Sequence, residues 1–514
     1  MWQKIKSFIS KHKYDALLFL SLVATAPFFY DKLGWVSLVA LLPMIFAIRH
    51  RFETKNTKNL VFIIWLFGLI YMLIVCSWVL NAHPQFLGVE QNASLSYFLY
   101  IAWVLMGLVL SLGFLLIGWV TARAIKVNFG FNKYILLFPF VWVAGEYLRS
   151  WGFSVIAYGR EATLGPNWNF GVIGFSVTNT PFAYAARIGG LFGLSLAVVF
   201  VNVAIYLIIV KRYQAVAIIG LSILLAILLA TTPGKDSSKL RVASLSMGYT
   251  SVQLNNTVDQ TDYEAADLLV TPEYSSFFKE NSTNGHGDFV ARLFKGREGV
   301  VIYSRITPRA GSLPYNEVVL ANQSASTIAK QPKRFLVPTG EYLPWVMQGF
   351  MSLVGRTNAT AEFDRLVGRS AGTKAERAFE VGSYKIGAQA CSGVLATDNY
   401  RALTMGGAEV LTNSASLYEF KDSPSFHNQA KQFASFIAIA NNRPFVQAAQ
   451  ASYSYILDKD GRFIKFNGDG GGVQLGTVEL GQSRTLYSLV GEWGAYASLI
   501  ITGILLIVLL KHKY

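Results

Sequence analysis

Long apolar runs are the feature that most constrains this chain. Of its 514 residues 53% are hydrophobic and only 15% are charged, which is too apolar for a soluble globular protein. The runs suited to membrane spans are residues 16–30, 33–48, 60–80, 97–120, 134–147, 188–210, 215–230 and 496–510. Pro27 follows a possible signal-cleavage site and should hinder cleavage, so the first run is predicted to be retained. The sequence therefore predicts a membrane protein of about eight spans.

Basic residues predict the orientation of these spans. They gather at the N-terminus and in alternate connections, at Lys4, Lys6, Lys11, Lys13, Arg49, Arg51, Lys55, Lys58, Arg123, Lys126, Lys133, Lys211, Arg212, Lys511 and Lys513. The positive-inside rule places both termini in the cytoplasm, and places loops 81–96 and 150–187 and the segment 234–484 on the other side. Since many basic residues flank spans, the net charge of +15 predicts no nucleic-acid partner.

The segment between the last two spans has the pattern of a separate domain. Strand-like runs occupy residues 240–245, 267–270, 299–303, 317–321, 383–390, 410–412, 445–449 and 453–457, and residues 426–440 have helical length. Alternating strands and helices predict a layered α/β domain, and the glycine cluster 468–472 is predicted to be a loop. The predicted division is residues 1–233 with seven transmembrane helices, 234–486 as the α/β domain, and 487–514 as the last helix and cytoplasmic tail.

Cys391 closes the apolar run VGSYKIGAQACSGVL, where a strand gives way to a loop. The other cysteine, Cys76, lies in an apolar span, so no disulfide is predicted. A lone thiol is often only a buried hydrophobe. Two charged residues stand at comparable strand ends, Glu273 after the run 268–270 and Lys333 before 335–338. A carboxylate, an ammonium and a thiol are the groups that nucleophilic attack on a carbonyl requires, and their joint placement favours catalysis.

The motifs around these residues resemble those of a known superfamily. TPEYS around Glu273, SLPYNEVVL around Asn316, KRFLVPTGEYLPW from Lys333 and AQACSGVL around Cys391 are similar to the Glu-Lys-Cys motifs of the nitrilase superfamily. In the membrane part, GEYLRSWGF, ARIGGLFGLS and TLYSLVGEWGAY resemble the bacterial apolipoprotein N-acyltransferases, which also carry an α/β domain before the last span. The similarity extends over almost the whole chain.

The resemblance implies an α-β-β-α sandwich on the extracytoplasmic face of a bacterial cytoplasmic (inner) membrane, and a ping-pong acyl transfer. Cys391 would take an acyl chain from a phospholipid, typically phosphatidylethanolamine, as a thioester. It would then pass the chain to the α-amine of the diacylglyceryl-cysteine of an apolipoprotein. By position, Glu273 would be the general base, Lys333 the oxyanion stabiliser and Glu341 a supporting carboxylate. No metal or cofactor is implied.

The chain departs from this family pattern near the thiol. An aromatic and an acidic residue usually follow the cysteine, whereas Ser392 and Gly393 stand here. The family's Asn-Asp-Ala-Trp is replaced at residues 413–416, its Arg-Ala-x-Glu at 437–440, and the stretch 247–273 looks shortened. These differences keep two alternatives open: a membrane-tethered nitrilase-type amidase or acyltransferase with another acceptor, and a catalytically weakened binder of lipid or lipoprotein.

Other residues have a structural and a functional interpretation. The stretch 342–354 is either a lid that dips into the outer leaflet or an ordinary buried helix. The candidates for substrate contacts are Trp345 and Phe350 in this stretch, together with Asn316. Glu146 and Arg149 have helical spacing and are predicted to pair with each other. The remaining candidate, His427, matches no catalytic position and is predicted to be a surface or capping residue.

Overall fold

The fold is taken from a computed structural model. It describes residues 13–82, 93–211, 213–230, 238–246, 265–273, 290, 293–324, 326–420, 423–450, 453–467 and 472–511. The N-terminal lysines 4, 6 and 11, the centre of loop 81–96, most of the stretch 247–273 and most of the glycine cluster 468–472 lie outside the described residues.

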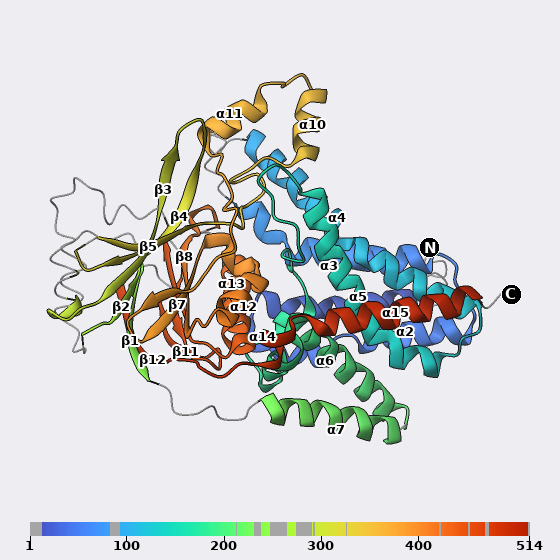
Figure 1. The fold of residues 1–514 in the computed structure, drawn as a ribbon. Helices are drawn as coiled ribbons and strands as arrows, with labels where there is room; N and C mark the ends of the chain where they lie inside the picture. Colours follow the sequence, from blue (N-terminus) through green and yellow to red (C-terminus); the bar gives the residue numbers. More distant parts are fainter. Residues whose placement is uncertain are drawn as a thin grey trace.

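Helices fill one half of the molecule, on the right in Figure 1. In chain order they are η1 (Leu20–Phe28), η2 (Asp31–Leu38), α2 (Leu42–Glu53), α3 (Leu60–Val75), η3 (Ser77–Asn81), α4 (Ala93–Lys126), α5 (Phe131–Ile156), η5 (Ile173–Val177), η6 (Pro181–Ala185), α6 (Ala186–Ile209), α7 (Tyr213–Ala230) and, at the C-terminal end, α15 (Trp493–Lys511). Because residues 231–492 separate α7 from α15 in sequence, the return of α15 to pack on α5 and α6 closes the bundle with the end of the chain.

Five helices among the described residues are long and apolar enough to cross a membrane: Asp31–Glu53, Leu60–Asn81, Leu99–Lys126, Pro181–Ile209 and Trp493–Lys511. They match five of the eight predicted spans. Residues 16–30 instead run into the 3-10 helix η1, which contains Pro27, a residue with no N–H to donate. Residues 134–147 belong to the longer α5, and 215–230 to α7. The prediction of about eight spans is therefore confirmed only for these five.

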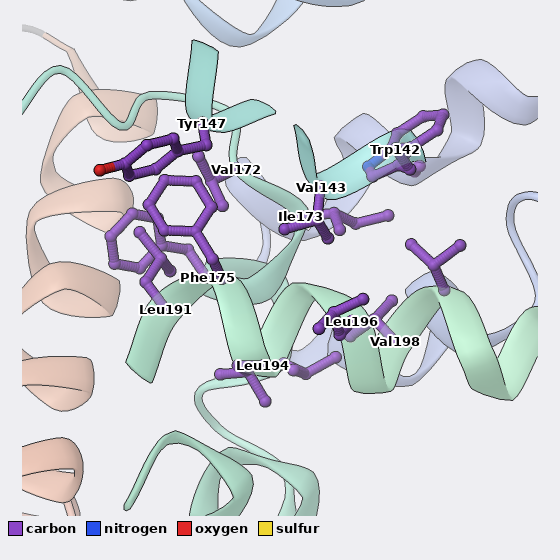
Figure 2. Close-up of a cluster of buried hydrophobic side chains, with 14 of the residues drawn as sticks. Trp142, Val143, Tyr147, Val172, Ile173, Phe175, Leu191, Leu194, Leu196 and Val198 are labelled. Carbon is purple, nitrogen blue, oxygen red and sulfur yellow. The ribbon is translucent and has the colours of Figure 1, made fainter. Parts of the chain in front are cut away.

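The loop after α5 is held by α5 itself. Glu146 Oε1 accepts a hydrogen bond from Ile173 N at 2.9 Å, and Arg149 Nη1 donates to Phe170 O at 2.8 Å. Glu146 and Arg149 interact electrostatically, as the predicted pairing implies, but the hydrogen bonds described for their side chains go to the backbone of the loop. Figure 2 shows the result, in which Ile173 and Phe175 of η5 lie among apolar side chains of α5 and α6.

The other half of the molecule contains two six-stranded sheets within the described residues. The first has the order β12-β1-β2-β3-β4-β5 and the second β11-β10-β9-β8-β7-β6. The strands are β1 (Lys239–Ser246), β2 (Leu268–Val270), β3 (Val300–Arg309), β4 (Ser312–Asn322), β5 (Thr327–Pro332), β6 (Phe379–Val381), β7 (Tyr384–Ala390), β8 (Val410–Ser416), β9 (Phe445–Gln450), β10 (Ser454–Leu457), β11 (Phe463–Asn467) and β12 (Gly472–Glu479). Parallel and antiparallel neighbours occur in both sheets, so both are mixed.

The sheets pack face to face on a continuous apolar core. Side chains such as Val242 and Leu268 of the first sheet and Ile386 and Val446 of the second form one buried cluster. Every strand-like run named from the sequence forms a strand, and the layered α/β prediction is confirmed. The remaining strands β5, β6, β11 and β12 were not predicted.

Helices on the second sheet connect it to the helical half (Figure 1). The helical elements of this half are α10 (Trp345–Leu353), α11 (Ala359–Leu366), η8 (Cys391–Leu395), α12 (Thr397–Met405), η9 (Tyr418–Phe420), α13 (Pro424–Asn441) and α14 (Leu486–Val490). Residues of α12 and α13 belong to the same buried cluster as the membrane helices, so the two halves share a core. His427 on α13 is only 4% exposed and packs on Tyr453, so its prediction as a surface residue is wrong.

Candidate active site

Lys333 is the centre of a buried charged cluster. It directly follows β5, and its side chain is 2% exposed. Its Nζ donates to both oxygens of Glu341, at 3.0 Å and 2.8 Å, and lies 3.4 Å from Glu273 Oε1. A buried ammonium requires such partners because its desolvation is costly. The three residues therefore form one unit with two carboxylates and one cation.

Glu273 is positioned by both sheets. It follows β2 of the first sheet, and its backbone N donates to Ala415 O of β8 in the second sheet at 3.1 Å. Asn316 of β4 donates from Nδ2 to Glu273 Oε1 at 2.6 Å. Burial raises the pKa of Glu273; Lys333 opposes this shift, Glu341 adds to it, and the hydrogen bond from Asn316 lowers the pKa. Glu273 is thus a carboxyl group that can take up a proton.

Cys391 begins the turn that ends β7. Its φ is +45°, a left-handed conformation that non-glycine residues rarely adopt and that is often found at functional sites. The thiol interacts with the Glu273 carboxylate, and Sγ lies 3.5 Å from Ser416 O. Burial raises the pKa of the Cys391 thiol well above its ordinary value, Glu273 raises it further, and Lys333 lowers it. The resting thiol is therefore protonated and needs a base, and Glu273 is beside it.

Other polar residues hold the backbone around this cluster. Asn413 of β8 donates from Nδ2 to Cys391 O and to Gln447 Oε1, both at 3.2 Å. Glu376 accepts from Gln389 Nε2 of β7 at 2.5 Å and from Arg334 N at 3.3 Å, and so connects the strand that carries the cysteine to the residue after Lys333. Sequence reasoning assigned no supporting role to Asn413, Gln389 or Glu376, since such contacts depend on how strands are paired.

The predicted substrate residues Trp345 and Phe350 are not part of this cluster. They lie on α10, in which no residue is buried; Trp345 is 55% exposed and Phe350 57%. Trp345 N donates to Tyr158 O at the end of α5, and the two rings are in edge contact. Since α10 is exposed, the alternative of an ordinary buried helix is wrong. Of the predicted substrate residues, Asn316 alone lies in the cluster, where it binds Glu273.

The charged cluster lies against the loop that follows α5. Tyr342 donates from its hydroxyl to Ala157 O at 2.8 Å, Thr163 Oγ1 donates to Arg334 O at 3.2 Å, and the ring of Trp168 packs on Phe335. The segment 333–343 that carries Lys333 and Glu341 is therefore in direct contact with the helical half of the molecule.

Comparisons with known proteins agree with this architecture. Residues 19–204 match the family model of the apolipoprotein N-acyltransferase N-terminal domain, and residues 239–487 match that of carbon-nitrogen hydrolases. An apolipoprotein N-acyltransferase of Geobacter metallireducens is 24% identical over 394 residues, which are 71% of this chain and 72% of that protein. Another from Allorhizobium ampelinum is 26% identical over 218 residues, 41% of this chain and 40% of that protein.

Among solved structures, a carbon-nitrogen hydrolase from Helicobacter pylori is similar with 14% identity and a TM-score of 0.34, covering 52% of this chain and 93% of its own. An amidase from Nesterenkonia sp. has the same identity and TM-score and covers 52% of this chain and 99% of its own.

Proposed function

The chain belongs to the apolipoprotein N-acyltransferase family, as a divergent member of the nitrilase superfamily, and on this premise we propose that it transfers an acyl chain from a phospholipid to an apolipoprotein. It is a multi-pass membrane protein with a nitrilase-like α/β part. The observation that carries the proposal is the buried cluster of Glu273, Lys333 and Glu341 beside the thiol of Cys391.

In the first half-reaction, Glu273 takes the proton of the Cys391 thiol as sulfur attacks the ester carbonyl of the phospholipid. The carbonyl oxygen becomes an oxyanion, which the Lys333 ammonium stabilises strongly because the site is buried. The carbon–oxygen ester bond then breaks, and Glu273 returns the proton to the leaving alcohol of the lysophospholipid. The product is an acyl thioester on Cys391.

In the second half-reaction, the α-amine of a diacylglyceryl-cysteine attacks the thioester carbonyl. Glu273 accepts the amine proton, an amide bond forms, the carbon–sulfur bond breaks, and the thiol is protonated again. Glu341 positions Lys333 throughout, since it accepts two hydrogen bonds from Nζ and a third from Val337 N at 3.0 Å. The same base thus acts in both halves of a ping-pong cycle.

We also propose the partners and the placement of the site. Phosphatidylethanolamine is the acyl donor, the protein lies in a bacterial cytoplasmic (inner) membrane, both termini are cytoplasmic, and the α/β part faces outward. The contacts of segment 333–343 with the end of α5 support a site at the membrane surface, where both lipid substrates are present. The exposed apolar residues of α10 support its immersion in the outer leaflet beside this site.

Intact-mass spectrometry tests the first half-reaction. Purified protein incubated with phosphatidylethanolamine should gain the mass of one acyl chain, hydroxylamine should remove it, and Cys391→Ala should show no gain. A Cys76→Ala variant is the matched control, because that thiol is buried within the helical half and should be dispensable. A folded wild-type protein that forms no adduct with any of several phospholipids would contradict the proposal.

A further inference from the structure

A cavity lies at the opposite end of β7 from the thiol. Its volume is about 420 Å³, and the residues around it include Ser383, Lys385, Glu409, Arg443 and Arg484. Ser383 and Lys385 stand at the start of β7, whereas Cys391 follows the end of this strand. A strand of this length spans roughly 20 Å. The cavity is therefore separate from the catalytic cluster, and its size is within the range of small-molecule sites.

The two carboxylates of the cavity already have partners. Glu409 accepts from Gln482 Nε2 through Oε1 at 3.2 Å and from Lys385 N through Oε2 at 3.3 Å. Glu380 Oε1 accepts from Lys385 Nζ at 2.6 Å. These bonds engage both acidic groups and the lysine of the cavity. A cationic ligand would have to compete with Lys385 for Glu380 and with two existing hydrogen bonds for Glu409.

The two guanidinium groups retain free hydrogen-bond donors. Arg443 is 2% exposed; its Nε donates to Ala408 O, and its Nη1 donates to Asn441 O, Asn442 O and Ser483 O. Among the described residues nothing accepts a hydrogen bond from its Nη2. Arg484 is exposed and forms no hydrogen bond or ion pair with any part of the chain that the structure describes.

The arginines also repel each other. The pKa of Arg443 is lowered to about 10, mainly by burial; the carboxylate of Glu409 opposes this shift, and the nearby charge of Arg484 adds to it. Two cations close enough to repel are stabilised by an anion between them, and guanidinium groups bind phosphate through paired hydrogen bonds. The free donors and the excess positive charge therefore fit a phosphate monoanion.

The elements beside the cavity place it at the membrane surface. Arg484 lies two residues before α14, on which Leu486, Leu489 and Val490 are each about half exposed. Their spacing puts them on one face of the helix. The candidate membrane span Trp493–Lys511 begins immediately after α14. This continuity places the apolar face of α14 in the interfacial layer, with Arg484 at the level of the lipid headgroups.

We propose that this cavity is an accessory binding site for an anionic phospholipid, whose headgroup phosphate is held by Arg443 Nη2 and Arg484 and whose acyl chains lie along the apolar face of α14. A zwitterionic headgroup fits less well, because the carboxylates that could pair with its ammonium are already engaged. The site is distinct from the donor site at Cys391, and its existence does not depend on acyl transfer.

Native mass spectrometry of the full-length protein in detergent, titrated with short-chain phosphatidylglycerol, tests the site. Arg484→Gln should weaken binding by about tenfold, as expected for loss of a charge-assisted hydrogen bond, and Arg484→Glu should weaken it more. The matched control is Arg309→Gln, which removes an exposed arginine of β3 in the other sheet and should leave binding unchanged. All three variants should elute as the wild type does in size-exclusion chromatography and unfold at the wild-type temperature, which shows that they are folded.

Three results would overturn the proposal. The first is wild-type affinity for phosphatidylglycerol in Arg484→Glu. The second is equal affinity of the wild-type protein for phosphatidylcholine. The third is displacement of phosphatidylglycerol by an equal concentration of inorganic phosphate or glycerol 1-phosphate, which would make the occupant a soluble phosphate compound. We expect these soluble phosphates to compete only at far higher concentration, because they make no contact with α14.

Discussion

Replacing Glu341 by Gln should move the pH dependence of Cys391 acylation to lower pH. Deprotonated Glu273 is the proposed base, so acylation should increase with pH through the pKa of this group. The negative charge of Glu341 raises the pKa of Glu273 and also that of the Cys391 thiol. The amide removes that charge, while its oxygen can still accept from Lys333 Nζ or Val337 N. Both pKa values therefore fall, and the midpoint of the pH–rate profile falls with them.

The size of this shift follows from the geometry of the cluster. Glu273 Oε1 and Glu341 Oε2 lie 3.4 Å and 2.8 Å from the same Lys333 Nζ, so they can be no more than about 6.2 Å apart, the sum of these distances. At an effective dielectric constant of about 20, two unit charges at that separation repel by roughly 3 kcal/mol. Relaxation of the site reduces this repulsion, and we expect the midpoint of the acylation profile to fall by about one pH unit or more.

Single-turnover acylation provides the measurement. Protein in detergent is mixed with phosphatidylethanolamine at a series of pH values, quenched, and the acylated fraction is read by intact-mass spectrometry. Glu362→Gln on α11 is the matched control, because it makes the same chemical change at an exposed position and should leave the midpoint unchanged. A Glu341→Gln midpoint equal to or above that of the wild type would refute the electrostatic account of the cluster.

Two further predictions use the same structure. Asn316→Leu removes the hydrogen bond that lowers the pKa of Glu273, so it should shift the acylation midpoint to higher pH, opposite to the effect of Glu341→Gln. An unchanged midpoint in the same assay would show that this hydrogen bond does not control the pKa of Glu273. The side chain of Leu353 on α10 is 87% exposed. In a Cys391→Ala background, a fluorescent label attached to Leu353→Cys should be quenched by brominated phospholipids. The same label attached to Glu362→Cys, at an exposed position on α11, should not be quenched. Equal quenching at the two positions would argue against selective immersion of α10.

The strands that sequence analysis found and those it missed differ in position within the sheets. The eight predicted strands are the inner strands of the two sheets, and β12, β5, β11 and β6 are their four edges. Inner strands are covered on both faces, so their sequences are dense in apolar residues. Edge strands carry polar residues and glycines, as in TIAKQP of β5 and GVQLGTVE of β12. Periodicity alone could not separate such segments from loops.

Prediction of the membrane part from the sequence was limited in a similar way. Composition identified apolar runs correctly, but their length in the sequence did not fix their conformation. Residues 16–30 pass from α-helix into the 3-10 helix η1, which contains Pro27, and residues 134–147 are part of a longer helix with buried Glu146 and Arg149. Hydropathy averages over such polar residues without showing what they bind. Their partners, the backbone of residues 170–173, become visible only in three dimensions.

For the catalytic cluster, the positions of residues at strand ends predicted which residues could lie close together, but they did not predict the contacts between them. Glu273, Lys333 and Cys391 follow β2, β5 and β7, and the packing of the two sheets brings them together. Glu341 was assigned only by resemblance, because it follows no strand and reaches Lys333 through a turn with Thr339 at positive φ. Asn413 and Glu376 bind through strand pairing and loop contacts that no local pattern encodes.

The departure from the family pattern after Cys391 has a structural explanation in this chain. Ser392 Oγ donates to Phe335 O at 2.8 Å and so attaches the turn that carries the thiol to the segment that carries Lys333. Gly393 packs so closely on Gln389 that an added Cβ would lie 2.7 Å from the Cβ of that side chain. Ser392 thus holds the turn against the segment that carries Lys333, and a larger side chain at position 393 would require Gln389 to shift. We infer that this chain keeps its nucleophile in place with contacts of its own while the charged cluster is retained.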